Sequence, residues 1–202
     1  MIARRGFAAT RLSDVADEAG LSVGTVQHYF GSREAVLAEA FRHMQETSLK
    51  RWHEHVAGES DPWRRIVSLL EGASIGGDRF RERWTLWMEF WAMCLRDDDL
   101  RRFSGDLHDA WQAPIVQAVA EGVAAGLFHP RAAPTDIADR LIALTDGLAL
   151  QILLEVPALT RERMRDLLVQ AAARDLDVDL GVETATGQSS ATAIVSPSSG
   201  TR

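Results

Sequence analysis

The sequence predicts an all-α fold in which a small N-terminal helix-turn-helix unit precedes a larger helical region. Apolar side chains recur at three- and four-residue spacing through most of the 202 residues, which is the period of one helix face. Glycines, prolines and capping residues divide this pattern into pieces of helix length. Strict alternation of apolar and polar residues, which marks half-buried strands, is almost absent.

The N-terminal unit is predicted from the residues that start and stop its helices. Leu12–Ala19 is a short helix for which Ser13 is a good N-cap. Gly20 ends this helix, because glycine adopts the left-handed backbone of a helix end at little cost. Ser22 then caps a second short helix, Val23–Tyr29. Together they predict two short helices joined by a tight turn.

We expect this unit to span residues 1–46 and the larger helical region to span 47–178. Asp97–Asp99 is predicted to be a solvated loop, and Pro114 is expected to kink the helix that contains it. Residues 179–202 are mostly Gly, Ser, Thr, Ala and Gln, so they are predicted to be a disordered tail. The remaining predicted helices begin at Arg33 and Pro62 and then cover Arg81–Leu95, Leu107–Gly126, Thr135–Leu154 and Thr160–Leu176.

Composition limits the possible location and partners. The net charge is −7, and residues 1–46 carry five arginines against six acids, so DNA binding there depends on the placement of a few charges. The single cysteine, Cys94, excludes an intrachain disulfide and fits a reducing cytoplasm. Neither a secretory signal nor an apolar run long enough to span a membrane is visible. We therefore expect a cytoplasmic protein with no membrane partner.

Two helices joined by a glycine turn are typical of DNA-binding units whose second helix enters the major groove. Gln27 and His28 offer donors and acceptors for base edges, and small residues at the start of the second helix allow close approach. Any short helix pair with a glycine turn shares this pattern, so the pattern alone is not specific. The expected contacts with a palindromic, double-stranded DNA operator are Thr10, Arg11, Ser22, Val23, Gly24, Thr25, Gln27, His28, Tyr29 and Arg33; of these, Thr10, Arg11, Tyr29 and Arg33 suit phosphates.

A longer match makes the pattern specific. Gly6–Leu37 contains a Gly-Phe pair, an A-G-L-S turn, a G-T-V-Q-H-Y-F stretch and the S-R-E-A-V-L start of the next helix. In these features it resembles the DNA-binding domain of the TetR family. The resemblance implies a helix-turn-helix over Arg11–Phe30 in a transcriptional regulator that is usually a repressor. The family carries a full helix before the Gly-Phe pair, whereas only Met1–Arg5 precede it here. We expect a truncated first helix or a true start upstream.

The larger region also carries a resemblance. Trp87–Asp97 and Leu141–Gln151 resemble the C-terminal domain of the BetI-like branch of this family, which implies a ligand-binding and dimerisation domain. In the family the last two long helices form a four-helix bundle with a second copy, so a homodimer is expected. The apolar positions of these two helices that are expected to support the bundle are Ile137, Leu141, Leu144, Leu148, Ile152, Met164, Leu167, Leu168 and Ala171.

Three tryptophans indicate a ligand pocket. Trp84, Trp87 and Trp91 share one helix face, which fits either core packing or an aromatic wall. Glu89 is the only charge between Trp84 and Leu95 and would suit a cationic effector, as tryptophan faces do. Helical rotation nevertheless places Glu89 about 140° from Trp84. Glu89 can therefore also face solvent or an arginine instead of the pocket. The expected pocket is Trp84, Trp87, Met88, Glu89 and Trp91, with a cationic or apolar small-molecule effector.

No chemistry of catalysis is visible in the sequence. No nucleophile, base and orienting group form a recognisable set, so the protein is not expected to be an enzyme, and no cofactor is expected. His53 and His55 lie on different faces of a helix, which argues against a metal site, and Cys94 fits a packed thiol. Two functions remain: a ligand-released DNA-binding regulator, or a helical homodimeric interaction module with a weakened DNA-binding domain. Salt-dependent binding to a palindrome separates them.

Overall fold

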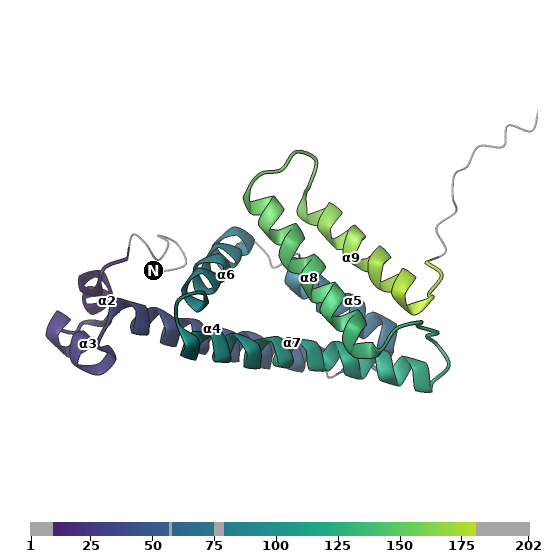
Figure 1. Cartoon of the computed structure of the whole chain (residues 1–202), viewed down its shortest axis with the longest axis horizontal. Helices are drawn as coiled ribbons and strands as arrows, with labels where there is room; N and C mark the ends of the chain where they lie inside the picture. The colour runs from purple at the N-terminus through teal and green to yellow at the C-terminus, as the bar shows by residue number, and fades with distance from the viewer. Residues whose placement is uncertain (1–9, 57, 75–78, 181–202) are drawn as a thin grey trace, which may run out of the picture.

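The computed structural model describes residues 10–56, 58–74 and 79–180, and every regular element in those ranges is an α-helix. Figure 1 shows α2 and α3 at one end, the long helices α4 and α7 along the base, and α8 beside α9 above them. The predicted all-α class is confirmed. The helices are α2 (Leu12–Ala19), α3 (Val23–Phe30), α4 (Arg33–Val56), α5 (Pro62–Ser74), α6 (Phe80–Cys94), α7 (Asp98–Ala124), α8 (Pro134–Leu153) and α9 (Arg161–Leu176).

The described part of the N-terminal unit has its own small core. Ala16 of α2, Val26 of α3 and Val36 of α4 are buried against one another. Gly20 adopts φ 66°, as predicted, and turns the chain between the two short helices. The expected Ser13 cap is wrong: α2 spans the predicted residues, but its N-cap is Arg11, whose N–H donates to the Asp14 carboxylate at 2.8 Å.

Helix α4 belongs to both parts of the molecule. Near its start Val36 packs on α2 and α3, and further along Phe41 stacks on Phe90 of α6, with ring centroids 3.9 Å apart. The expected boundary between residues 46 and 47 therefore falls inside one continuous helix. A rigid helix that crosses this boundary can carry a displacement from one region to the other.

Helix α7 starts earlier than predicted. It begins at Asp98 instead of Leu107, because the Asp97 carboxylate accepts the N–H groups of Asp99 and Leu100 at 2.9 and 3.0 Å. The predicted Asp97–Asp99 loop is thus a helix cap followed by the first helical turn. Pro114 lies within α7, which continues on both sides of it.

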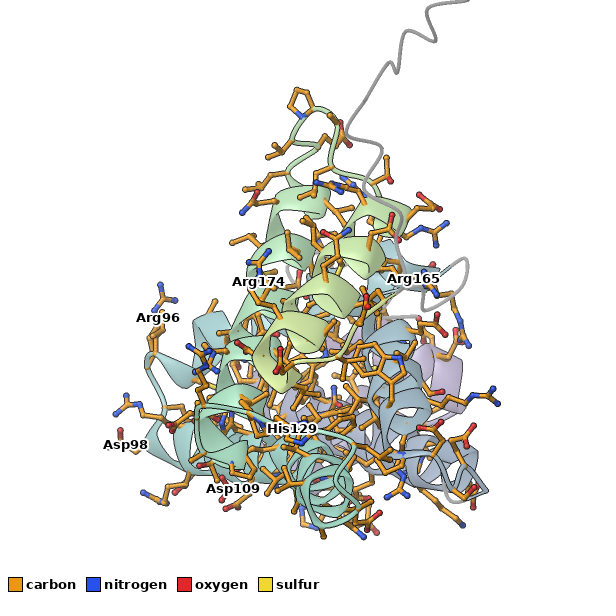
Figure 2. All side chains as sticks on the ribbon, turned by 90° about the vertical axis from the view of Figure 1, so that its right-hand side faces the viewer. Arg96, Asp98, Asp109, His129, Arg165 and Arg174 are labelled. Atoms are coloured by element: carbon orange, nitrogen blue, oxygen red, sulfur yellow. The ribbon has the colours of Figure 1, made fainter. Side chains whose placement is uncertain are left out.

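Helices α5, α7, α8 and α9 share the main core. Ile137 and Leu141 of α8 and Met164 and Leu168 of α9 are all at most 1% exposed within this single chain. These four residues were expected to support pairing with a second copy, and that expectation is wrong because they pack inside the subunit. In Figure 2, Arg165 projects from α9, where it forms an ion pair with Glu71 of α5 at 2.6 Å.

The end of α7 depends on a glycine. Gly122 is buried, and its carbonyl accepts the N–H of Phe128 at 3.2 Å after the chain turns at Gly126, which has φ 71°. A Cβ on Gly122 would overlap the Phe128 ring.

Gly122→Ala is therefore expected to destabilise the protein by about 1–3 kcal/mol, because Phe128 must leave its site. Thermal and urea unfolding measure the change. Gly105→Ala on the same helix is the matched control, because nothing lies within 4 Å of its Cβ; it is expected to be neutral or stabilising by up to about 1 kcal/mol. Equal stability of the two variants would contradict the close contact at Gly122.

Two expectations fall on residues that the structure does not describe. The expectation of a truncated first helix concerns residues 1–9, and most of the predicted tail falls in residues 181–202. Within the described ranges, no helix combines the length and apolar character that crossing a bilayer requires.

Candidate functional site

Helix α3 presents a polar face to the outside. Val26 points inward and is 2% exposed, whereas Tyr29 is 77% exposed, and Gln27 and His28 are exposed beside it. At the start of the helix, Ser22 Oγ accepts the Thr25 N–H at 3.0 Å. The outer face of α3 therefore carries donors and acceptors on a helix that is fixed from behind by its core contacts.

The remaining predicted contact residues differ in exposure. Ser22, Val23, Gly24 and Arg11 are exposed, and Thr25 is half-buried. Thr10 is only 2% exposed, and its carbonyl oxygen accepts a hydrogen bond from Arg33 Nη1 at 3.3 Å. Thr10 and Arg33 thus hold the start of α2 against the start of α4. This placement differs from the expectation that the Thr10 side chain faces a phosphate, because the residue is packed behind the surface.

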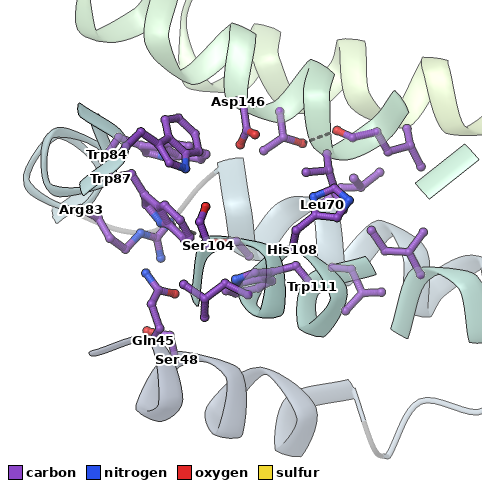
Figure 3. Close-up of a pocket in the computed structure, with 18 of the residues that line it drawn as sticks. Gln45, Ser48, Leu70, Arg83, Trp84, Trp87, Ser104, His108, Trp111 and Asp146 are labelled. Carbon is purple, nitrogen blue, oxygen red and sulfur yellow. Dashed lines mark hydrogen bonds between the residues drawn. The ribbon is translucent and has the colours of Figure 1, made fainter. Parts of the chain in front are cut away.

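A second candidate site lies inside the larger region. A cavity of about 260 Å³ opens between α4, α5, α6, α7 and α8 (Figure 3). Its size suits a small organic molecule, and a mostly apolar lining with a few polar groups is typical of ligand sites. The apolar lining includes Leu69, Leu70, Leu107, Ile115, Leu141 and Ile142.

Aromatic rings form one wall of the cavity. Trp84, Trp87 and Trp91 of α6 all line it, and Trp111 of α7 joins them. The same rings also pack in the core: Trp87 lies edge-on to Phe41 with centroids 4.9 Å apart. The two interpretations of the tryptophan face, core packing and aromatic wall, therefore describe the same residues.

Two expected pocket residues lie elsewhere. Met88 packs against the main core and Glu89 is half-buried, and neither is among the residues that line the cavity. For Glu89 the reason is helical rotation: at about 100° per residue, it lies about 140° from Trp84 and about 160° from Trp91 around the helix axis.

Asp146 supplies the negative charge that Glu89 was expected to supply. It lies on α8, lines the cavity and forms no hydrogen bond or ion pair with any residue in the described ranges. Removal of water from around its carboxyl group raises its pKa to about 6, although the nearby His108 acts in the opposite direction. At neutral pH the cavity therefore holds a mostly ionised carboxylate that accepts no hydrogen bond from the described residues.

The α4 side of the cavity is polar in a different way. Arg83 lines it and donates from Nη2 to the Gly72 carbonyl at 3.2 Å. Burial lowers the pKa of this guanidinium, and repulsion from Arg79 adds to the effect. Gln45 and Ser48 of α4 lie on the same side in Figure 3, across from Asp146. The cavity thus has an anionic end at α8 and a hydrogen-bonding end at α4.

The sequence held a signal for Asp146 that was missed. Asp146 is the only charged residue between Arg140 and Glu155, in an otherwise apolar stretch. Glu89 has the same feature in α6, as the only charged residue between Trp84 and Leu95. No comparable signal marks Gln45, which stands among ordinary polar residues of α4.

The N-terminal unit is a helix-turn-helix with an exposed polar second helix, and α4 joins it to a helical region with an internal cavity. This combination is typical of a DNA-binding regulator. A family model described as bacterial regulatory proteins of the tetR family matches residues 1–40. A second model, described as the C-terminal part of a BetI-type transcriptional repressor, matches residues 62–177, more than half of the chain. The chain belongs to the TetR family of bacterial transcriptional regulators and has a BetI-type C-terminal region.

Individual relatives agree with this assignment. The chain is 28% identical over 171 residues to the HTH-type transcriptional regulator PksA of Bacillus subtilis, covering 84% of this chain and 82% of that protein. It is 28% identical over 151 residues to BetI of Burkholderia lata, covering 72% and 73%. These relatives are transcriptional regulators and not enzymes.

Solved structures share the fold. A transcriptional regulator from Saccharomonospora viridis, in complex with choline, matches with a TM-score of 0.76 and 29% identity over 84% of this chain and 88% of that one. A TetR-family regulator from Rhodococcus matches with a TM-score of 0.72 and 25% identity, over 87% and 92%.

Proposed function

We propose that this protein is a homodimeric repressor that binds a palindromic operator and is released from it by a small organic cation. The observation that carries the proposal is the cavity itself, which is lined by several tryptophans and by a half-buried carboxylate that accepts no hydrogen bond from the described residues. Aromatic faces attract cations, and a desolvated carboxylate gains most from an opposite charge. The Saccharomonospora relative, which is in complex with choline, agrees with this choice of ligand.

The DNA-binding part of the proposal rests on the exposed face of α3. Gln27 and His28 are assigned to base edges, and Ser22, Val23, Gly24 and Thr25 to the close approach of the helix. Arg11 and Tyr29 are assigned to phosphates. Thr10 and Arg33 are assigned to holding α2 in place, because they contact each other.

The dimer is proposed to form through the outer surfaces of α8 and α9. Leu150, Leu154 and Val156 are 39–68% exposed near the end of α8, which leaves an apolar surface outside the subunit core. A two-fold dimer matches a palindromic operator, because each recognition helix then meets one half-site. Since the partner is DNA, the proposed location is the cytoplasm.

The direct test is binding of the full chain to the DNA upstream of its own gene over a salt series, measured by fluorescence anisotropy. Tight, salt-sensitive binding is expected. The bound complex is then titrated with choline and with 3,3-dimethylbutan-1-ol, its neutral isostere in which carbon replaces nitrogen. Release by choline alone supports the proposal, and equal release by the isostere would show an apolar effector instead. Should the region lack an operator, selection from random DNA replaces it, and failure of that selection would contradict DNA binding.

The affinity for a quaternary ammonium ion is expected to depend on pH. Such an ion keeps its charge at every pH, so only the protein titrates. Because the pKa of Asp146 is raised to about 6, the anionic form binds the cation above that pH, and affinity falls as the pH drops below it.

Calorimetric titration with choline between pH 5 and pH 8 measures this dependence. The expected loss approaches tenfold per pH unit below the pKa for a site that binds only the anion. An affinity that stays flat over this range would show that Asp146 does not face the bound cation.

A further inference from the structure

A polar atom of the cavity has no partner in the described part of the protein. Gln45 is 2% exposed, and its Oε1 accepts no hydrogen bond from those residues. Buried acceptors are nearly always paired in folded proteins, because an unpaired one loses its contacts with water and gains nothing in return. Since Gln45 lines the cavity, a molecule bound there is well placed to supply the missing donor.

The neighbours of Gln45 narrow the kind of group that fits. Figure 3 shows Gln45 rising from α4 toward Arg83 of α6, while Asp146 lies across the cavity on α8. A guanidinium only donates hydrogen bonds, and Gln45 Oε1 only accepts them. A hydroxyl group satisfies both, since it accepts and donates at once. A carboxylate satisfies Arg83 but brings no proton to Gln45.

We propose that the effector carries a hydroxyl group at the end remote from its cationic group, and that this hydroxyl donates to Gln45 Oε1 and accepts from Arg83. Gln45 is then the residue that determines specificity at the α4 end of the cavity. This inference rests on the proposed function, because it takes the cation at the Asp146 end as given. It also places one ligand contact on the helix whose start packs against the DNA-binding unit.

The test compares matched cations. Hydroxyalkyl-trimethylammonium ions with two-, three- and four-carbon chains, the first being choline, are each paired with the alkyl-trimethylammonium ion that lacks the hydroxyl. Carboxyalkyl analogues of the same lengths form a third series. Dissociation constants are measured by calorimetry for the wild type, Gln45→Met and Gln45→Glu. Gln117→Met, which places the same substitution on the exposed surface of α7 outside the cavity, is the control.

At one chain length or more, the hydroxyl compound is expected to bind the wild type roughly 10- to 100-fold more tightly than its alkyl partner. Gln45→Met is expected to abolish this preference, because methionine has a similar shape but no strong acceptor. Gln45→Glu, which keeps an acceptor, and Gln117→Met are expected to retain it.

The contrary outcomes are distinct. A wild type that binds the cations but shows no hydroxyl preference at any length overturns the role of Gln45. So does a preference that survives in Gln45→Met, or tighter binding of the carboxylate series. Failure of every cation to bind overturns the proposed function instead, so the two failures are distinguishable.

Discussion

Asp146→Asn is expected to weaken the binding of choline by about 2–3 kcal/mol, roughly 30- to 150-fold. This is the order of the attraction between two charges about 5 Å apart at a partly buried site. The neutral isostere of choline should bind the variant and the wild type equally, because an uncharged ligand has no charge–charge attraction to the Asp146 carboxylate. Asp136→Asn is the matched control, since Asp136 is an exposed carboxylate in the first turn of the same helix.

The same substitution is expected to stabilise the empty protein. A carboxyl group whose pKa is higher in the folded state than in the unfolded state favours folding most at low pH, and that contribution is lost as the pH rises from about 4 through about 6. At pH 7.5 the ionised Asp146 therefore costs stability, on the order of 1–2 kcal/mol after allowance for its partial exposure to solvent. Asparagine removes that cost, so the melting temperature of the variant should rise while choline binding falls. A lower melting temperature together with unchanged affinity would contradict the assignment of Asp146.

Gln27→Ala and His28→Ala are each expected to cost about 1–3 kcal/mol of operator affinity and to leave binding to unrelated DNA nearly unchanged. Contacts with base edges carry the sequence information, whereas phosphate contacts do not. Arg11→Ala is the contrasting variant: it should weaken binding to all sequences and reduce the salt slope by about one. Competition titrations with operator and scrambled duplexes separate these effects. Equal losses on both duplexes for Gln27→Ala would place that side chain on the backbone instead.

The local organisation of the N-terminal unit could be read from sequence because short-range rules govern it. Gly20 ends α2 and Ser22 caps α3 through contacts with residues close in the sequence. The positions of the two helices therefore followed from these capping residues alone. The start of α7 was missed for the opposite reason. Three adjacent aspartates suggested a loop, although Leu100, Phe103 and Leu107 already carried the helical spacing.

The cavity was only partly predictable. Trp84, Trp87 and Trp91 were found because they share one helix face, which is a local property. Asp146 and Gln45 line the same cavity from α8 and α4, and no spacing rule within one helix reveals that these helices meet α6 there. The inward packing of Met164 and Leu168 was not predicted either. An apolar helix face looks the same in the sequence whether it packs against its own chain or against a second copy.

The continuity of α4 has a thermodynamic consequence. Gln45, near the middle of this helix, lines the cavity, and Val36, near its start, packs beneath α3. If the effector lowers operator affinity by some factor through this helix, then the operator must lower effector affinity by the same factor, because the two binding steps close one cycle. DNA is then an antagonist of the effector, and the concentration of effector needed for half-saturation must be higher for the operator complex than for the free protein.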